Sequence, residues 1–278
     1  MSLLTPSRYP AKIYSHTDED APQLANADGV IKTILKACLV TGYGTKEGAG
    51  WTMLFDDTTR IVLRAPEAGQ ALGMPDIKIE NGAGKYRIVS QSDPSGLDDP
   101  QELSSTPLLS KDSSFRPVWS LVATDIGFVF WYGMAENGWA WGTTKGTMLG
   151  CFFNKSLLAS GENIPVIFHP NANISASTGI GSTSWLLSTP CKNAISNSVL
   201  PNPTFLKSSI TDPLLDIYQF AIAGDTLVAG VLYSLNRTIR SNEAAIINGD
   251  QHYLRVCTFG EMSQYKIEYY IPIDYWEL

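Results

Sequence analysis

The apolar residues between positions 30 and 39 repeat with the period of an α-helix that buries one face. The same period places Lys32 and Lys36 on the opposite face, in solvent. Asn26 or Asp28 is placed to accept hydrogen bonds at the start of this helix, and Gly42 suits a left-handed turn at its end. The segment therefore predicts one amphipathic helix near the N-terminus. Its buried residues are Val30, Ile31, Ile34, Leu35, Cys38 and Leu39.

Most of the remaining chain has the pattern of β-strands joined by short polar turns. Residues 51–55 and 60–65 form one predicted hairpin, and residues 77–91 form a second around the favoured turn pair Asn81-Gly82. The third hairpin, 118–133, is apolar almost throughout, so both of its faces are expected to be buried. With about a dozen predicted strands and one helix, an antiparallel arrangement is favoured, because parallel βαβ units would need more helices. The predicted fold is mainly β: an antiparallel β-sandwich or barrel-like structure with one N-terminal amphipathic helix.

The domain organisation rests on a polar stretch at 155–162 that follows the aromatic hairpins. A division there gives an N-terminal helix-plus-hairpin domain, 1–158, and a C-terminal β-rich domain, 159–278. One intertwined domain is the alternative. The long polar segments 92–116 and 191–213 are expected to be ordered loops or segments that fold on a partner.

The composition limits the partners of the chain. Charged residues make up 17% of the 278 residues, the net charge is −7, and basic residues never cluster, so a nucleic-acid surface is not expected. A low-charge surface is typical of proteins covered by partner chains, and equally of β-rich proteins with Ser-, Thr- and Asn-rich loops. No apolar run reaches the ~18 residues of a membrane span, and the first residues lack a signal-peptide core. These patterns predict a soluble product, made in the cytoplasm, with no membrane partner.

Candidate chemistry is sparse. None of the common nucleophile, metalloprotease, phosphate-loop or dinucleotide motifs occurs, and Gly42-Tyr43-Gly44 follows a helix, so it is interpreted as a turn. The four cysteines are far apart and are interpreted as buried thiols, and the three histidines do not cluster with them, which argues against zinc. Asp18-Glu19-Asp20 is expected to place favourable charge near the helix start, with a weak cation site as the alternative. No enzyme activity, cofactor or metal is predicted.

Three tryptophans are the candidate binding residues: Trp131, Trp139 and Trp141. Such a cluster is typical of core and edge packing in a β-sheet. It is also typical of a sugar-stacking platform or of an aromatic protein interface.

The N-terminal segments IYSHTDEDAPQL, ILKACLVTGYG and KEGAGWTMLFDD resemble a known signature. Together they are similar to the N-terminal region of a family of tailed-bacteriophage virion proteins, in which APQL, ACLVxGYG and AGWT motifs follow in this order and spacing. The resemblance is good over residues 9–60, patchy over 110–155 and faint beyond. Lys36 stands where the family commonly has an acidic residue, and the region between Ala65 and Pro117 diverges.

The resemblance implies a non-enzymatic structural protein located in the virion and made in the bacterial host cytoplasm. Its implied partners are other virion proteins and copies of itself, and it carries over no catalytic residue. Head decoration, connector or collar, and tail-associated positions all stay open. A receptor- or carbohydrate-binding module of the virion, with host surface glycan as its partner, is the alternative function. A polysaccharide-degrading enzyme, which needs two carboxylates across a cleft, is the third.

Overall fold

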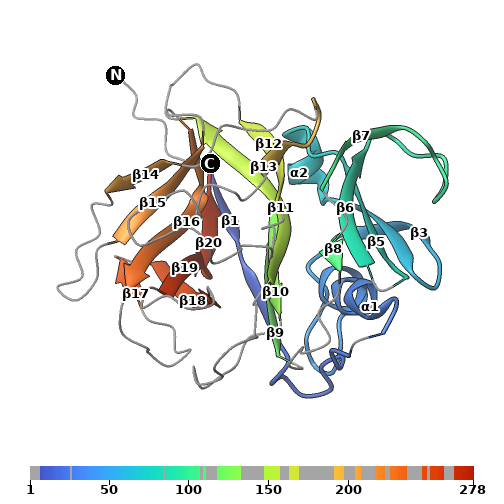
Figure 1. The fold of residues 1–278 in the computed structure, drawn as a ribbon, viewed down its shortest axis with the longest axis horizontal. Helices are drawn as coiled ribbons and strands as arrows, with labels where there is room; N and C mark the ends of the chain where they lie inside the picture. The colour runs from blue at the N-terminus through green and yellow to red at the C-terminus, as the bar shows by residue number, and fades with distance from the viewer. Residues whose placement is uncertain are drawn as a thin grey trace.

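The computed structural model confirms the predicted fold class: the chain is mainly β, and every pair of described strands is antiparallel (Figure 1). The structure describes residues 7–25, 27–83, 85–106, 109–110, 118–132, 147–156, 163–168, 191–196, 204–207, 217–222, 226–236, 246–248, 251–259 and 266–278.

The described strands form three sheets. The smallest sheet pairs β1 (Arg8–Pro10) with β20 (Tyr275–Glu277), so an early and a late segment of the chain lie side by side. The second has the order β3-β4-β5-β6-β7, with β8 also paired to β6. Its strands are β3 (Thr52–Asp56), β4 (Arg60–Arg64), β5 (Asp76–Gly82), β6 (Lys85–Gln91), β7 (Glu102–Ser105) and β8 (Leu109–Ser110).

The largest sheet has twelve strands, and eight of them follow the order β17-β18-β19-β16-β11-β10-β9-β2. Strands β12 and β13 continue from β11, and β15 and β14 continue from β16. The strands are β2 (Lys12–Ser15), β9 (Trp119–Thr124), β10 (Gly127–Tyr132), β11 (Thr147–Ser156), β12 (Ile164–Phe168), β13 (Cys191–Asn193), β14 (Thr204–Lys207), β15 (Ile217–Ile222), β16 (Thr226–Asn236), β17 (Ile246–Asn248), β18 (Gln251–Phe259) and β19 (Lys266–Pro272).

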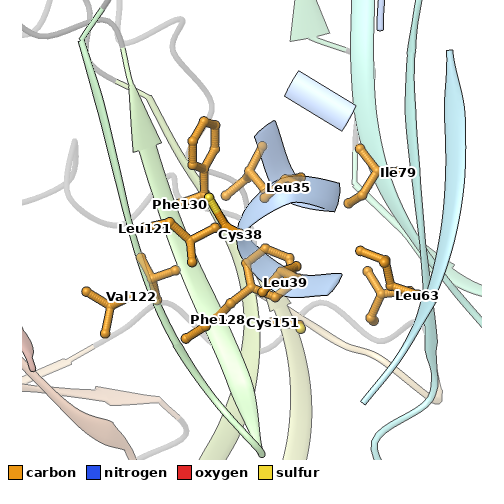
Figure 2. Packing of buried hydrophobic residues seen from close by; sticks show 14 of the residues in the cluster. Leu35, Cys38, Leu39, Leu63, Ile79, Leu121, Val122, Phe128, Phe130 and Cys151 are labelled. Atoms are coloured by element: carbon orange, nitrogen blue, oxygen red, sulfur yellow. The ribbon is translucent and has the colours of Figure 1, made fainter. Parts of the chain in front are cut away.

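The predicted N-terminal helix lies between two sheets. It consists of α1 (Val30–Lys36), which continues directly into a π-helical segment, η1 (Ala37–Thr41). Figure 2 shows Cys38 and Leu35 facing Leu121 and Phe130 of the β9–β10 wall, with the six-stranded sheet on the other side of the helix. Because apolar side chains cover it from two sides, the helix is part of the core. A second short helix, α2 (Glu67–Ala71), was not predicted.

The start of α1 differs from the prediction. The Ile31 N–H donates to Oδ1 of Asn81, a fully buried residue of β5, at 3.0 Å. Asp28 instead accepts a hydrogen bond from the Ala83 N–H at 2.9 Å, so the predicted cap at Asp28 is wrong, and Asn26 lies outside the described residues. The predicted end is right in part, because Gly42 ends the helical segment with a positive φ of 76° but an extended ψ of 176°. A Cβ there would lie 2.3 Å from the Lys46 carbonyl oxygen.

This cap gives a direct prediction. Replacing Asn81 with alanine removes the acceptor for the Ile31 N–H in a buried position, and we expect the free energy of unfolding to fall by about 1–2 kcal/mol. Asp28→Ala should cost less, since the Asp28 carboxylate accepts its hydrogen bond from the Ala83 N–H at an exposed position, whereas Asn81 is fully buried. Chemical denaturation of both variants measures the difference, and a larger loss for Asp28→Ala would show that the cap is misassigned.

Lys32 lies against the sheet and not in solvent, contrary to the prediction. Its Nζ donates to Asp56 Oδ1 at 2.7 Å and to the carbonyl oxygen of Asp57 at 2.6 Å. The less buried Lys36 donates to the other oxygen of Asp56. The sequence period placed these lysines correctly opposite the apolar stripe, but the β3–β4 turn covers that side of the helix as well.

The predicted hairpins at 51–65 and 118–133 are confirmed by the β3–β4 and β9–β10 pairs. The predicted hairpin at 77–91 is confirmed by the β5–β6 pair, but Asn81 and Gly82, which were predicted to lie in its turn, belong to the strand. Strand β5 extends through Gly82, which pairs with Lys85, and Ala83 carries a positive φ of 52°. Asn81 therefore lies within the strand, where it is free to cap the helix.

The twelve-stranded sheet crosses the predicted boundary at residue 158. One edge of β11 pairs first with β10 and then, over its last residues, with β16. The opposite edge pairs with β12. Strands from both halves of the chain thus belong to one sheet, and the division into two domains stays a prediction.

Candidate functional site

The three N-terminal signature segments, IYSHTDEDAPQL, ILKACLVTGYG and KEGAGWTMLFDD, meet in one hydrogen-bonded cluster around Asp18. Oδ2 of Asp18 accepts hydrogen bonds from the Tyr43 hydroxyl at 2.7 Å, from Lys46 Nζ at 2.7 Å and from the Ser15 N–H at 2.8 Å. Burial alone would raise the pKa of Asp18, but the hydrogen bonds from Lys46 and Tyr43 outweigh it and lower the pKa below its usual value. Asp18 therefore binds the loop after the helix, and the prediction that it acts near the helix start is wrong.

The loop between η1 and β3 is a turn, as predicted for the Gly42-Tyr43-Gly44 sequence. Tyr43 and Lys46 form an antiparallel bridge across it. The loop is fastened to β2 by side chains: the Tyr14 hydroxyl donates to the Glu47 carbonyl oxygen at 2.7 Å, and Lys12 Nζ donates to the Gly48 carbonyl oxygen at 2.8 Å. Sequence analysis did not identify these partners, since an isolated lysine or tyrosine beside a turn carries no distinctive pattern.

Two tryptophans connect the signature segments to the β9–β10 hairpin. Trp119 donates from Nε1 to the carbonyl oxygen of Pro22, in the APQL segment, at 3.0 Å. Its ring lies edge-on to Tyr43, with 6.3 Å between the ring centroids. Trp51, in the AGWT segment, donates to the Thr124 carbonyl oxygen at 3.2 Å and packs edge-on against Phe128. Each signature motif thus has a partner on the same hairpin. These contacts connect the helix and the loop between η1 and β3 to the β9–β10 hairpin.

The outer face of the six-stranded sheet, away from the helix, carries a network of ion pairs. The side chain of Lys78 is only 4% exposed, and its Nζ lies 3.1 Å from Oε1 of Glu80. Arg87 binds both Glu80 and Glu102. Burial alone would raise the pKa of Glu80, but the hydrogen bonds from Arg87 and Lys78 outweigh it and lower the pKa. Each buried charge is therefore compensated within the sheet.

The polar segment after β6 is an ordered loop, as predicted, over residues 92–106. It folds back over the same sheet face, where Asp93 pairs with Arg64 at 3.1 Å and the Asp99 carbonyl oxygen accepts a hydrogen bond from Gln91. Its last part forms β7, which was not predicted. Of the remainder, only the short strand β8 is described, and most of the segment 191–213 also lies outside the described residues.

Of the three candidate tryptophans, only Trp131 is described. It lies on β10 opposite Ser120 of β9, and its side chain alternates with those of Phe130 and Phe128, which point toward the helix. Trp131 is 4% exposed, and its Nε1 finds no hydrogen-bond partner among the residues that the structure describes. The buried ring does not offer an open stacking surface in this structure. Trp139 and Trp141 lie outside the described residues, so a platform built from them stays a prediction.

The described residues assemble little that could act as a nucleophile, base or metal ligand. Cys38 and Cys151 are buried, and burial raises the pKa of both thiols. His252 pairs through Nδ1 with Asp274 at 2.9 Å on an exposed surface. Among the residues the structure describes, no three His, Cys, Asp or Glu side chains come together where they could hold a metal ion. Within the same residues, no helix combines the length and apolar character that crossing a bilayer requires.

The lowered pKa of Asp18 predicts how acid affects stability. A carboxylate whose pKa is lower in the folded chain than in the unfolded chain stabilises the fold above the unfolded value, about 3.9, and this contribution is lost as the pH falls through the folded value. We expect wild type to be more stable than Asp18→Asn by a constant amount above about pH 5. The difference should shrink below about pH 4. A difference that stays constant down to pH 2 would show that the charge of Asp18 does not contribute.

No protein-family model, curated protein or solved structure matches this chain. Its function is therefore argued from the signature and from the geometry of the Asp18 cluster.

Proposed function

We propose that the chain is a non-enzymatic structural component of a tailed-bacteriophage virion, where it assembles with other virion proteins and with copies of itself. The observation that supports this proposal is the use of the signature residues. The side chains of Asp18, Tyr43 and Trp51 all form hydrogen bonds within the same framework. The signature residues therefore stabilise the fold, as expected of a structural protein.

The way the framework is made also suits an assembly protein. The helix is held between two sheets, and the outer-face charges of the six-stranded sheet pair with one another. Such a body can keep its shape while neighbouring chains bind to its surface. The low content of charged residues favours repeated contacts with other chains over electrostatic binding of nucleic acid.

The proposal is tested by measuring the copy number of the chain in purified particles. Quantitative peptide mass spectrometry of gradient-purified virions should find it at a fixed ratio to the major capsid protein. A fixed ratio that survives high-salt washing supports a structural component. Absence from particles that were made in cells rich in the protein would overturn the proposal and favour a role outside the virion.

A further inference from the structure

Strand β2 is the last strand of the twelve-stranded sheet along its main order, so one of its edges faces away from β9. The His16 N–H donates to the Trp119 carbonyl oxygen, which extends the β2–β9 ladder by one residue. In an antiparallel ladder, alternate residues direct both backbone groups toward the partner strand. Since the backbone groups of Tyr14 and His16 point toward β9, those of Ile13 and Ser15 point toward the opposite edge, which no described strand occupies.

Two side chains and one backbone group close most of this edge. Lys46 Nζ donates to the Ile13 carbonyl oxygen at 2.9 Å. The Ser15 N–H donates to Asp18 Oδ2 at 2.8 Å, and the Ser15 carbonyl oxygen accepts from the Asp18 N–H at 3.1 Å. Among the described residues, the Ile13 N–H is the outward group that has no partner. Because Asp18 and Lys46 also pair with each other, they act as one unit, which we call the edge guard.

The edge would otherwise be suitable for strand addition. The register of β2 against β9 runs without a bulge, whereas β3, an edge strand of the six-stranded sheet, has an irregularity between Met53 and Phe55 that disturbs its edge. Ile13 is 36% exposed and offers an apolar side chain beside the edge. Unprotected regular edges of this kind pair readily with other chains.

A second copy of this chain fits the edge by its own sequence. Antiparallel pairing of two β2 strands about a two-fold axis places Ile13 opposite Ser15 and Tyr14 opposite Tyr14 of the other copy. Lys12 then faces His16, so no two residues of like fixed charge are opposed. This register also brings the outward backbone groups of Ile13 and Ser15 together, as an antiparallel ladder requires.

We propose that Asp18 and Lys46 are an edge guard that prevents β2 from pairing with β2 of a second copy of this chain. The guard keeps separate chains apart until a contact displaces the lysine, whose side chain is partly exposed. The inference rests on the edge geometry alone, so it stands or falls independently of the virion role.

The test is self-association of an Asp18→Ala/Lys46→Met variant, measured by sedimentation velocity over a range of concentrations. The variant is expected to associate at least 10-fold more tightly than wild type. The matched control is Asp98→Ala/Lys85→Met, which makes the same change of charge at exposed positions away from β2. This control should behave as wild type.

A third variant identifies the edge that pairs. Adding Ile13→Pro to the guard variant removes the outward N–H without removing a bond of the β2–β9 ladder, and it should return association to the wild-type level. Association that persists in this variant, or a folded guard variant that associates no more tightly than wild type, would overturn the proposal. Near-ultraviolet circular dichroism checks folding, and if the double variant is unfolded, Lys46→Met alone carries the same expectation.

Discussion

Replacing Trp119 with alanine is expected to lower the free energy of unfolding by about 3–5 kcal/mol, the usual cost of truncating a fully buried large aromatic side chain. Trp119 has no exposed surface, and its ring packs against Tyr43 and Phe130. The cavity would open where the signature segments meet β9. Urea denaturation followed by far-ultraviolet circular dichroism measures the loss.

Trp119→Phe is the matched variant, because it keeps an aromatic ring but removes the hydrogen bond to Pro22. We expect it to cost only about 1–2 kcal/mol. A loss below about 1 kcal/mol for Trp119→Ala would contradict the central position of this residue. Equal losses for both variants would mean that the hydrogen bond, and not packing, accounts for its contribution.

Replacing Asp56 with alanine is expected to cost about 3 kcal/mol, because it leaves the largely buried ammonium of Lys32 without its carboxylate. Burial alone would raise the pKa of Asp56, but the hydrogen bonds from Lys32 and Lys36 outweigh it and lower the pKa. In the native structure the Asp56 carboxylate compensates the charge of Lys32. Without it, the free energy cost of burying the lysine ammonium is no longer offset. Thermal and chemical unfolding measure the loss.

The control is Asp98→Ala, which breaks an ion pair with Arg60 that is open to solvent. Exposed pairs contribute little, so this variant should stay within about 0.5 kcal/mol of wild type. If Asp56→Ala were equally mild, Lys32 would have to reach water when its partner is removed. The compensated buried pair would then not be a determinant of the fold.

The parts of the fold that could be predicted depend on local periodicity. The helix around Ile34, the β3–β4 hairpin and the apolar β9–β10 hairpin all have side-chain patterns that repeat within a few residues. Burial of both faces of β9 and β10 also followed from their nearly continuous apolar sequence. These features need no knowledge of distant contacts.

The features that were missed depend on distant partners. Asn81 caps a helix fifty residues earlier, and Lys32 is neutralised by Asp56 from the next hairpin. Both roles are decided by which elements pack together, and the composition around each residue gives no signal of it. The Asp18 cluster was missed for the same reason: Asp18 is one of three acidic residues before a helix, while its side-chain partners Tyr43 and Lys46 lie after that helix.

The structure also brings together other residues than those the sequence suggested as a site. Sequence alone favoured the tryptophans, because aromatic clusters are conspicuous, but Trp131 is buried in the sheet. The residues that join the signature segments are Asp18, Tyr43 and Lys46, whose roles depend on the turn at Gly42 and on β2 lying beside it. These residues lie in the segments on which the resemblance rests, and the resemblance itself stays a prediction.

The most direct test of the proposed virion role is immunogold electron microscopy of purified particles, with an antibody raised against the recombinant chain. The account predicts label at one fixed place on every particle, whether on the head, the neck or the tail, and this place would also identify its position. Particles without label, from cells in which the protein is abundant, would contradict the account.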